Sequence, residues 1–137
     1  MYTPVSSRAA TAYRQVGVQS CVDGATPHML IKMLFDGLMQ SLNAARGALQ
    51  RGEIEEKGRQ LGKAVRILEE GLKAGLNPEQ GGELAGNLRA LYDYCIKRLT
   101  LANLRNDIGM VEEVVELITP VAKSWEQIGA DNQGGGA

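Results

Sequence analysis

The spacing of the prolines constrains the fold of this chain more than any other feature of its sequence. Only Pro4, Pro27, Pro78 and Pro120 occur among its 137 residues, and long uninterrupted stretches lie between them. Proline breaks or kinks the interior of a helix, so these stretches leave room for long helices. Aromatic residues make up 4% of the chain, which requires an aliphatic core. The sequence therefore predicts an all-α protein.

Helix start and stop signals divide these stretches further. Thr26 and Pro27 form a strong start signal, a capping side chain followed by a proline in the first turn. Gly75 is a natural end for a second helix, and Asn106 separates a third from a fourth. Pro120 is expected to cause a kink or a local irregularity in the fourth. The predicted helices span residues 27–50, 53–74, 81–104 and 107–128.

Helices of about 22 residues joined by short connections favour antiparallel neighbours, which predicts an up-down-up-down four-helix bundle. A chain of 137 residues is long enough for one such domain with a single core. We assign the bundle to residues 26–129. Residues 1–25 are expected to form an N-terminal segment with a short helix, and residues 130–137 a disordered C-terminal tail.

Charge and motifs argue against several classes of function. The formal net charge of −1 lacks the basic excess that is typical of nucleic-acid binders. The single histidine, His28, falls in a predicted first helical turn, where local capping suits it better than catalysis, and no Glu-x-x-His metal motif occurs. Cys21 and Cys95 lie far apart and form no redox or metal-binding pair. We therefore expect no enzyme activity, no cofactor and no metal site.

The hydropathy of the sequence bears on whether the protein is inserted into a membrane or secreted. No apolar run reaches the roughly 20 residues that span a bilayer. The N-terminus also lacks the apolar stretch of a signal peptide. We expect a soluble, cytoplasmic protein that does not insert into membranes.

The apolar faces of the predicted helices differ in width. The second helix carries one narrow seam, formed by Ile54, Leu61, Val65, Leu68 and Leu72. The third carries a core stripe formed by Leu84, Leu88, Leu91, Cys95, Leu99 and Ala102. In the fourth helix, Trp125 belongs to the core stripe. The first, third and fourth helices each carry further apolar residues beside their core stripes, more than a bundle core requires.

Three interpretations of this surplus stay open. It forms a wide core with scattered exposed residues, a homodimer interface of a structural or adaptor module, or a groove for an apolar helix of another protein. For the third interpretation the candidate partner-binding residues are Ile31, Phe35, Met39, Tyr94, Leu101, Met110, Leu117 and Val121.

Several segments of the chain resemble FliS, the family of flagellin-specific export chaperones. The resemblance covers nearly the whole chain, in order, through the segments 13–38, 63–107 and 125–128. Its most specific pieces are Pro-His-x-Leu-Ile-x-Met-Leu-Phe-Asp-Gly from Pro27, Gly-Gly-Glu from Gly81, and Asn-Leu-x-x-Leu-Tyr-Asp-Tyr from Asn87.

The resemblance implies a function. Proteins of this family are antiparallel four-helix bundles of the bacterial cytosol that bind the disordered C-terminal segment of flagellin. The segment becomes helical and wraps around the bundle, which prevents premature polymerisation and helps to present flagellin to the flagellar type III export gate. The resemblance thus implies two partners, which are flagellin and, in the flagellin-loaded state, an export gate component. It also implies that the free protein is mainly monomeric.

The resemblance also implies a lid. In this family the N-terminal segment can lie over part of the flagellin site and must move when flagellin binds. The matching residues here are Ala10, Tyr13 and Val16. The family usually has a larger aliphatic residue where this chain has Ala10, so we expect the lid to be held less tightly.

Overall fold

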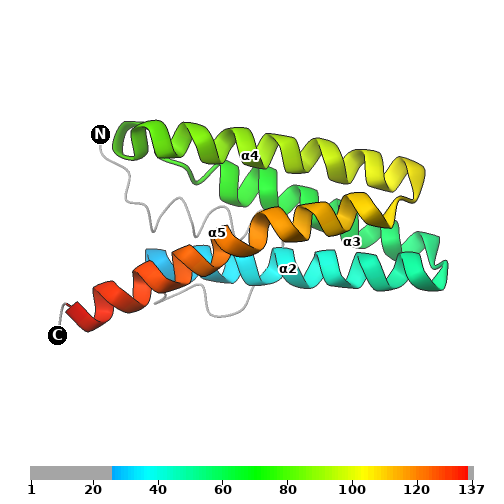
Figure 1. Ribbon diagram of the computed structural model, residues 1–137, viewed down its shortest axis with the longest axis horizontal. Helices are drawn as coiled ribbons and strands as arrows, with labels where there is room; N and C mark the ends of the chain where they lie inside the picture. The colour runs from blue at the N-terminus through cyan, green and yellow to red at the C-terminus, as the bar shows by residue number, and fades with distance from the viewer. Residues whose placement is uncertain (1–25, 136–137) are drawn as a thin grey trace.

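The computed structural model describes the backbone of residues 26–135 and their side chains, except those of Gln80 and residues 129–135. The helices in this range are α2 (Pro27–Arg51), α3 (Ile54–Arg66), the π-helix η1 (Ile67–Lys73), α4 (Pro78–Arg105) and α5 (Ile108–Gly135). Successive long helices run in opposite directions, and each packs against the two that flank it (Figure 1). The predicted all-α helical bundle is confirmed. Among the described residues, no helix could cross a membrane.

The start and end of α2 follow the predicted signals. The Met29 amide donates a hydrogen bond to the Thr26 hydroxyl oxygen, at 3.1 Å, and Pro27 occupies the first helical position. Gly52 follows the helix in a left-handed conformation, with φ 71°. The helix therefore begins where the sequence predicts and ends one residue later.

The second predicted helix changes type along its length. Its last part, η1, is a π-helix, and the amide of Ala74 donates to the carbonyl of Glu69, five residues earlier, at 3.2 Å. The π-helix begins at Ile67, which is fully buried although the predicted seam omits it. The seam assignment was also wrong at Ile54, which is about half exposed because it is the first residue of α3.

Lys57 lies on the buried face of α3. Its ammonium donates to two oxygens of Asn103 near the end of α4, the carbonyl at 2.8 Å and Oδ1 at 2.7 Å. A buried charge is tolerated when hydrogen bonds replace its hydration, so this contact holds α3 against α4.

The buried seam of α4 differs from the predicted stripe by one position near its start. It passes through Ala85 and Tyr92, whereas Leu84 is 64% exposed, so the assignment of Leu84 to the core was wrong. The reason is the spacing: the seam advances by alternating steps of three and four, as in a coiled coil. Its members are Ala85, Leu88, Tyr92, Cys95, Leu99 and Ala102.

α5 differs from the expected 107–128 helix at its C-terminal end. Its start agrees, since the Met110 amide donates to Asp107 Oδ1 at 3.3 Å. Pro120 lies inside the helix without ending it. The helix then reaches Gly135, into the tail that is expected to be disordered. Each further residue of a helix adds a backbone hydrogen bond, and no proline follows Pro120 to interrupt it.

Candidate partner-binding groove

An apolar groove of about 540 Å³ lies at the end of the bundle where α2 begins and α5 approaches its end. Its floor includes Ile31 and Phe35 of α2 and Leu72 of η1. One wall is the first part of α4, and the other is the second half of α5. The turn between η1 and α4 closes one side with Gly75 and Leu76.

The two walls are continuations of the core seams. On α4 the seam residues Ala85, Leu88 and Tyr92 line the groove. On α5 the residues Val121 and Trp125 do the same, and Ile128 extends the row by one more step. Both rows keep the alternating steps of three and four, so each forms one face of its helix. The groove is therefore an unfilled extension of the core between α4 and α5.

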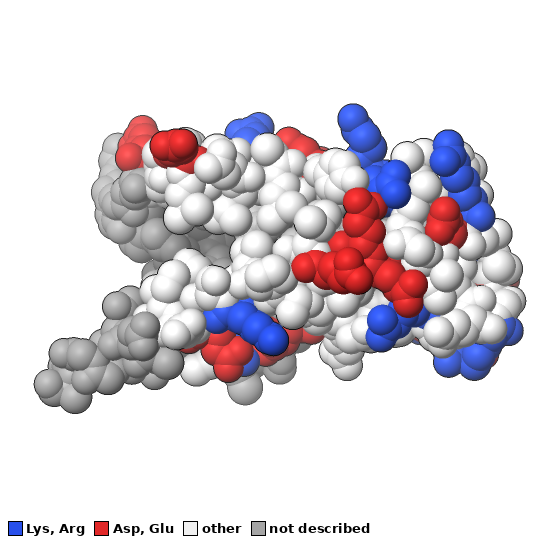
Figure 2. Space-filling view, viewed as in Figure 1, with Lys and Arg blue, Asp and Glu red and all other residues white. Residues whose placement is uncertain are grey.

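The lining of the groove contains no charged residue. In Figure 2 the described surface between the start of α4 and the second half of α5 carries neither acidic nor basic side chains. Leu84, at the rim, adds a large exposed apolar side chain. An uncharged, elongated hollow between helices suits an apolar segment of another protein better than a charged or strongly polar ligand.

His28 fixes the position of Trp125 in the α5 wall. The two rings stack, with centroids 5.0 Å apart and planes 9° apart. His28 Nε2 donates to the Trp125 carbonyl at 2.6 Å, and the Trp125 indole N–H donates to the His28 carbonyl at 3.1 Å. His28 therefore contacts α5 across the bundle, and its assignment to local capping was wrong.

Tyr92 is the most buried polar side chain of the lining. Its side chain is only 3% exposed, and burial raises the pKa of its phenol, which stays neutral at physiological pH. Within the described residues its hydroxyl has no hydrogen-bond partner. Among the described residues, every side-chain oxygen without a hydrogen-bond partner has some exposure to solvent. The Tyr92 hydroxyl therefore reaches the surface, and the surface that Tyr92 lines is the groove.

The structure brings three of the predicted binding residues into the groove, namely Ile31, Phe35 and Val121. Met110 is buried in the core. The half-buried members that pack against the core outside the groove lining are Met39, Leu101 and Leu117. The residues assigned to the lid, Ala10, Tyr13 and Val16, lie outside the described residues.

Tyr94 takes part in a polar contact between α4 and α5, away from the groove. Its hydroxyl donates to Glu113 at 2.6 Å, and Arg98 Nε donates to the other carboxylate oxygen at 2.6 Å. The hydrogen bond from Tyr94, followed by that from Arg98, lowers the pKa of Glu113. Cys95 is buried beside them, and this burial raises the pKa of its thiol to about 11, which makes it unreactive.

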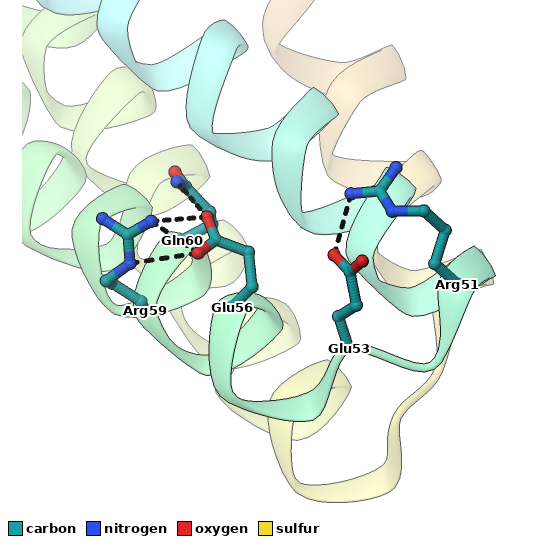
Figure 3. Close-up of polar contacts among 5 residues, drawn as sticks. All are labelled: Arg51, Glu53, Glu56, Arg59 and Gln60. Atoms are coloured by element: carbon teal, nitrogen blue, oxygen red, sulfur yellow. Dashed lines mark hydrogen bonds and ion pairs between the residues drawn. The ribbon is translucent and has the colours of Figure 1, made fainter.

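A second hollow, at the opposite end of the bundle, has a different character. It lies at the turn between α2 and α3, where Arg51 donates to Glu53 at 3.0 Å and Glu56 accepts from Arg59 and Gln60 (Figure 3). Apart from Ile54, the residues that line this hollow are charged, and the ion pairs among them lie at the surface. The described residues also contain no cluster that could hold a metal ion.

Sequence patterns missed several groove residues, including Leu84, Tyr92, Trp125 and Ile128. Their apolar periodicity places them on or beside the core seam, and periodicity cannot tell where a neighbouring helix diverges and leaves the seam uncovered. The sequence signal for an irregular helix at this end of the bundle was the pair Gly81-Gly82, because glycines in a helical stretch mark a break.

Comparison with known proteins gives a consistent result. The family model described as "Flagellar protein FliS" matches residues 9–132. The flagellar secretion chaperone FliS of Salmonella typhimurium is 51% identical to this chain over 93% of both sequences. The flagellar secretion chaperone FliSB of Pseudomonas aeruginosa is 45% identical over 88% of this chain and 95% of its own length. FliS of Escherichia coli is 42% identical over 89% and 90%.

Proposed function

Because this chain belongs to the FliS family, whose members are named flagellar secretion chaperones, we propose that it binds the C-terminal segment of flagellin in the bacterial cytoplasm. It is a chaperone by family and not an enzyme. Binding keeps flagellin from polymerising before export. The loaded complex is then recognised by a component of the flagellar type III export gate.

The observation that carries this proposal is the uncharged groove between α2, α4 and α5. When a disordered segment becomes ordered it loses conformational entropy, and this loss costs roughly 2–5 kcal/mol of binding free energy. Burial of apolar surface, at about 25 cal/mol per Å², is the main term that offsets this loss. An elongated groove with apolar rows on both walls supplies such surface, and a client helix would use apolar residues spaced three and four apart.

The N-terminal segment is proposed as the lid of this groove. In the empty protein a segment around Tyr13 would shield the apolar walls from water. It would also compete with the client and lower the apparent affinity. With Ala10 in place of a larger aliphatic residue, the lid is held less tightly and this competition is weaker.

Isothermal titration calorimetry with a synthetic peptide of the cognate flagellin C-terminal segment tests the function. We expect one peptide per chain, a negative heat-capacity change from apolar burial, and a gain of helicity in circular dichroism. Light scattering should give a mass near 14.7 kDa for the free chain. The absence of binding heat at several temperatures would contradict the proposal, and a free mass near twice that value would favour the homodimer interpretation.

A matched pair of variants tests whether the groove is the binding site. Leu84→Asp places a charge on the groove rim, and we expect it to weaken peptide binding at least about tenfold, because the apolar contact is lost and the carboxylate must be desolvated. Leu104→Asp alters a leucine that is 78% exposed on the same helix but lies outside the groove lining. Both variants should keep the wild-type melting temperature. Equal weakening by both would contradict the assignment of the site.

A further inference from the structure

Among the polar side chains of the groove lining, only the hydroxyl of Tyr92 is both deeply buried and without a hydrogen-bond partner in the described residues. Asn77 Oδ1 already accepts from the Glu79 amide, at 3.1 Å. Ser124, on the opposite wall, is exposed and keeps access to water. The Trp125 indole N–H already donates to the His28 carbonyl. Tyr92, in contrast, is 3% exposed, and its hydroxyl has no hydrogen-bond partner in the described part of the chain.

A client that covers the groove must deal with this hydroxyl. Little of Tyr92 reaches the surface, so any segment seated between the walls would remove its remaining contact with water. A hydroxyl that is buried without a partner disfavours binding, and the free energy lost is comparable to that of a broken hydrogen bond. A wholly apolar client face is therefore a poor match for this groove.

From this we propose, on the basis of the proposed function, that Tyr92 is a specificity residue that selects a flagellin segment with one neutral polar side chain on its otherwise apolar bound face. The partner is Asn, Gln, Ser or Thr, whose oxygen accepts from the Tyr92 hydroxyl. A carboxylate is disfavoured because the lining offers no cation to compensate for its desolvation. One hydrogen bond in an apolar groove also sets the register of the client helix, as single buried polar residues do in coiled coils.

The test compares two tyrosine variants of the full chain in calorimetric titrations with the flagellin C-terminal peptide. Tyr92→Phe removes the hydroxyl and should weaken binding at least about fivefold, because the polar group of the peptide is left without its partner. Tyr94→Phe is the matched control, since its hydroxyl bonds Glu113 away from the groove, and it should leave the affinity unchanged.

Peptide variants then identify the partner. Each Asn, Gln, Ser and Thr of the peptide is replaced in turn by Ala. One replacement should weaken binding to the wild-type chain, and the same replacement should cause little further loss in Tyr92→Phe. Strictly additive losses at every position would overturn the proposal.

The remaining outcomes also separate clearly. An unchanged or tighter affinity of Tyr92→Phe overturns the specificity role while leaving the proposed function intact, because it would mean that an apolar client covers the hydroxyl. If the wild-type chain binds no peptide, the proposed function fails, and this inference fails with it. In the free protein Tyr92→Phe should melt at or above the wild-type temperature, since the hydroxyl has no internal bond to lose. A lower melting temperature would contradict the premise.

Discussion

At the scale of single residues, the groove depends on side chains that hold one another in place. Trp125 is a large wall residue on a helix that is packed only partly at this end, and a free indole could adopt several rotamers there. The stacked imidazole of His28 and two reciprocal hydrogen bonds restrict it to one. The first turn of α2 thereby positions a residue of α5 that is 97 positions away in the sequence.

Replacement of His28 tests this positioning role. His28→Ala removes the ring stacking and the hydrogen bond to the Trp125 carbonyl, and we expect a loss of about 1–2 kcal/mol in the free energy of unfolding by urea. The emission of Trp125, the only tryptophan of the chain, should shift to longer wavelength as the indole meets more water. His28→Gln keeps a donor near the Nε2 position and should recover part of the stability. Identical behaviour of the Ala variant and the wild type would contradict the role.

At the scale of helices, α4 contains the backbone feature that shapes one end of the groove. Gly82 has φ 52° and ψ −125°, a conformation that side-chain-bearing residues rarely adopt. It separates the first turn of α4 from the rest of the helix, and Gly81 beside it lines the groove. This end of the wall therefore depends on a residue without a Cβ atom.

Two glycine substitutions on α4 give opposite predictions. Gly82→Ala should lower the free energy of unfolding by about 1–3 kcal/mol, because alanine is strained at this φ and ψ. Gly86→Ala is the control: it lies within the helix, nothing would touch its added Cβ atom, and it should stabilise the protein by about 0.5–1 kcal/mol. Urea unfolding measures both. A stabilising Gly82→Ala would contradict the strained geometry.

The helices themselves were largely predictable from the sequence. Thr26 and Asp107 act as caps at the expected places because capping depends on a few neighbouring atoms. The exposure of Leu84 and the burial of Ile67 were not predictable from a uniform turn of about 100° per residue. A π-helical turn and the 3–4 spacing of a bundle seam depend on packing against other helices, which one helix does not encode by itself.

At the scale of the whole molecule, the two ends of the bundle differ in chemistry. The end with the α2–α3 turn carries paired charges, as Arg51 and Glu53 illustrate (Figure 3). At the other end α4 and α5 diverge (Figure 1), and their core seams continue past their mutual contact and line an uncharged groove. The described surface there carries no charged side chains (Figure 2). Apolar surface between diverging helices is unfavourable in water, and another apolar segment that covers it is stabilised by its burial. This asymmetry makes the groove the best candidate for the client site.

The emission of Trp125 tests this central claim most directly, because the chain has no other tryptophan and this one lines the groove. The measurement is a fluorescence titration with a tryptophan-free peptide of the flagellin C-terminal segment, followed in parallel by calorimetry. We predict a saturating shift of the emission to shorter wavelength, with the same midpoint and one-to-one stoichiometry as the binding heat. Binding heat without any change in the emission of Trp125 would show that the client binds elsewhere and would contradict the account.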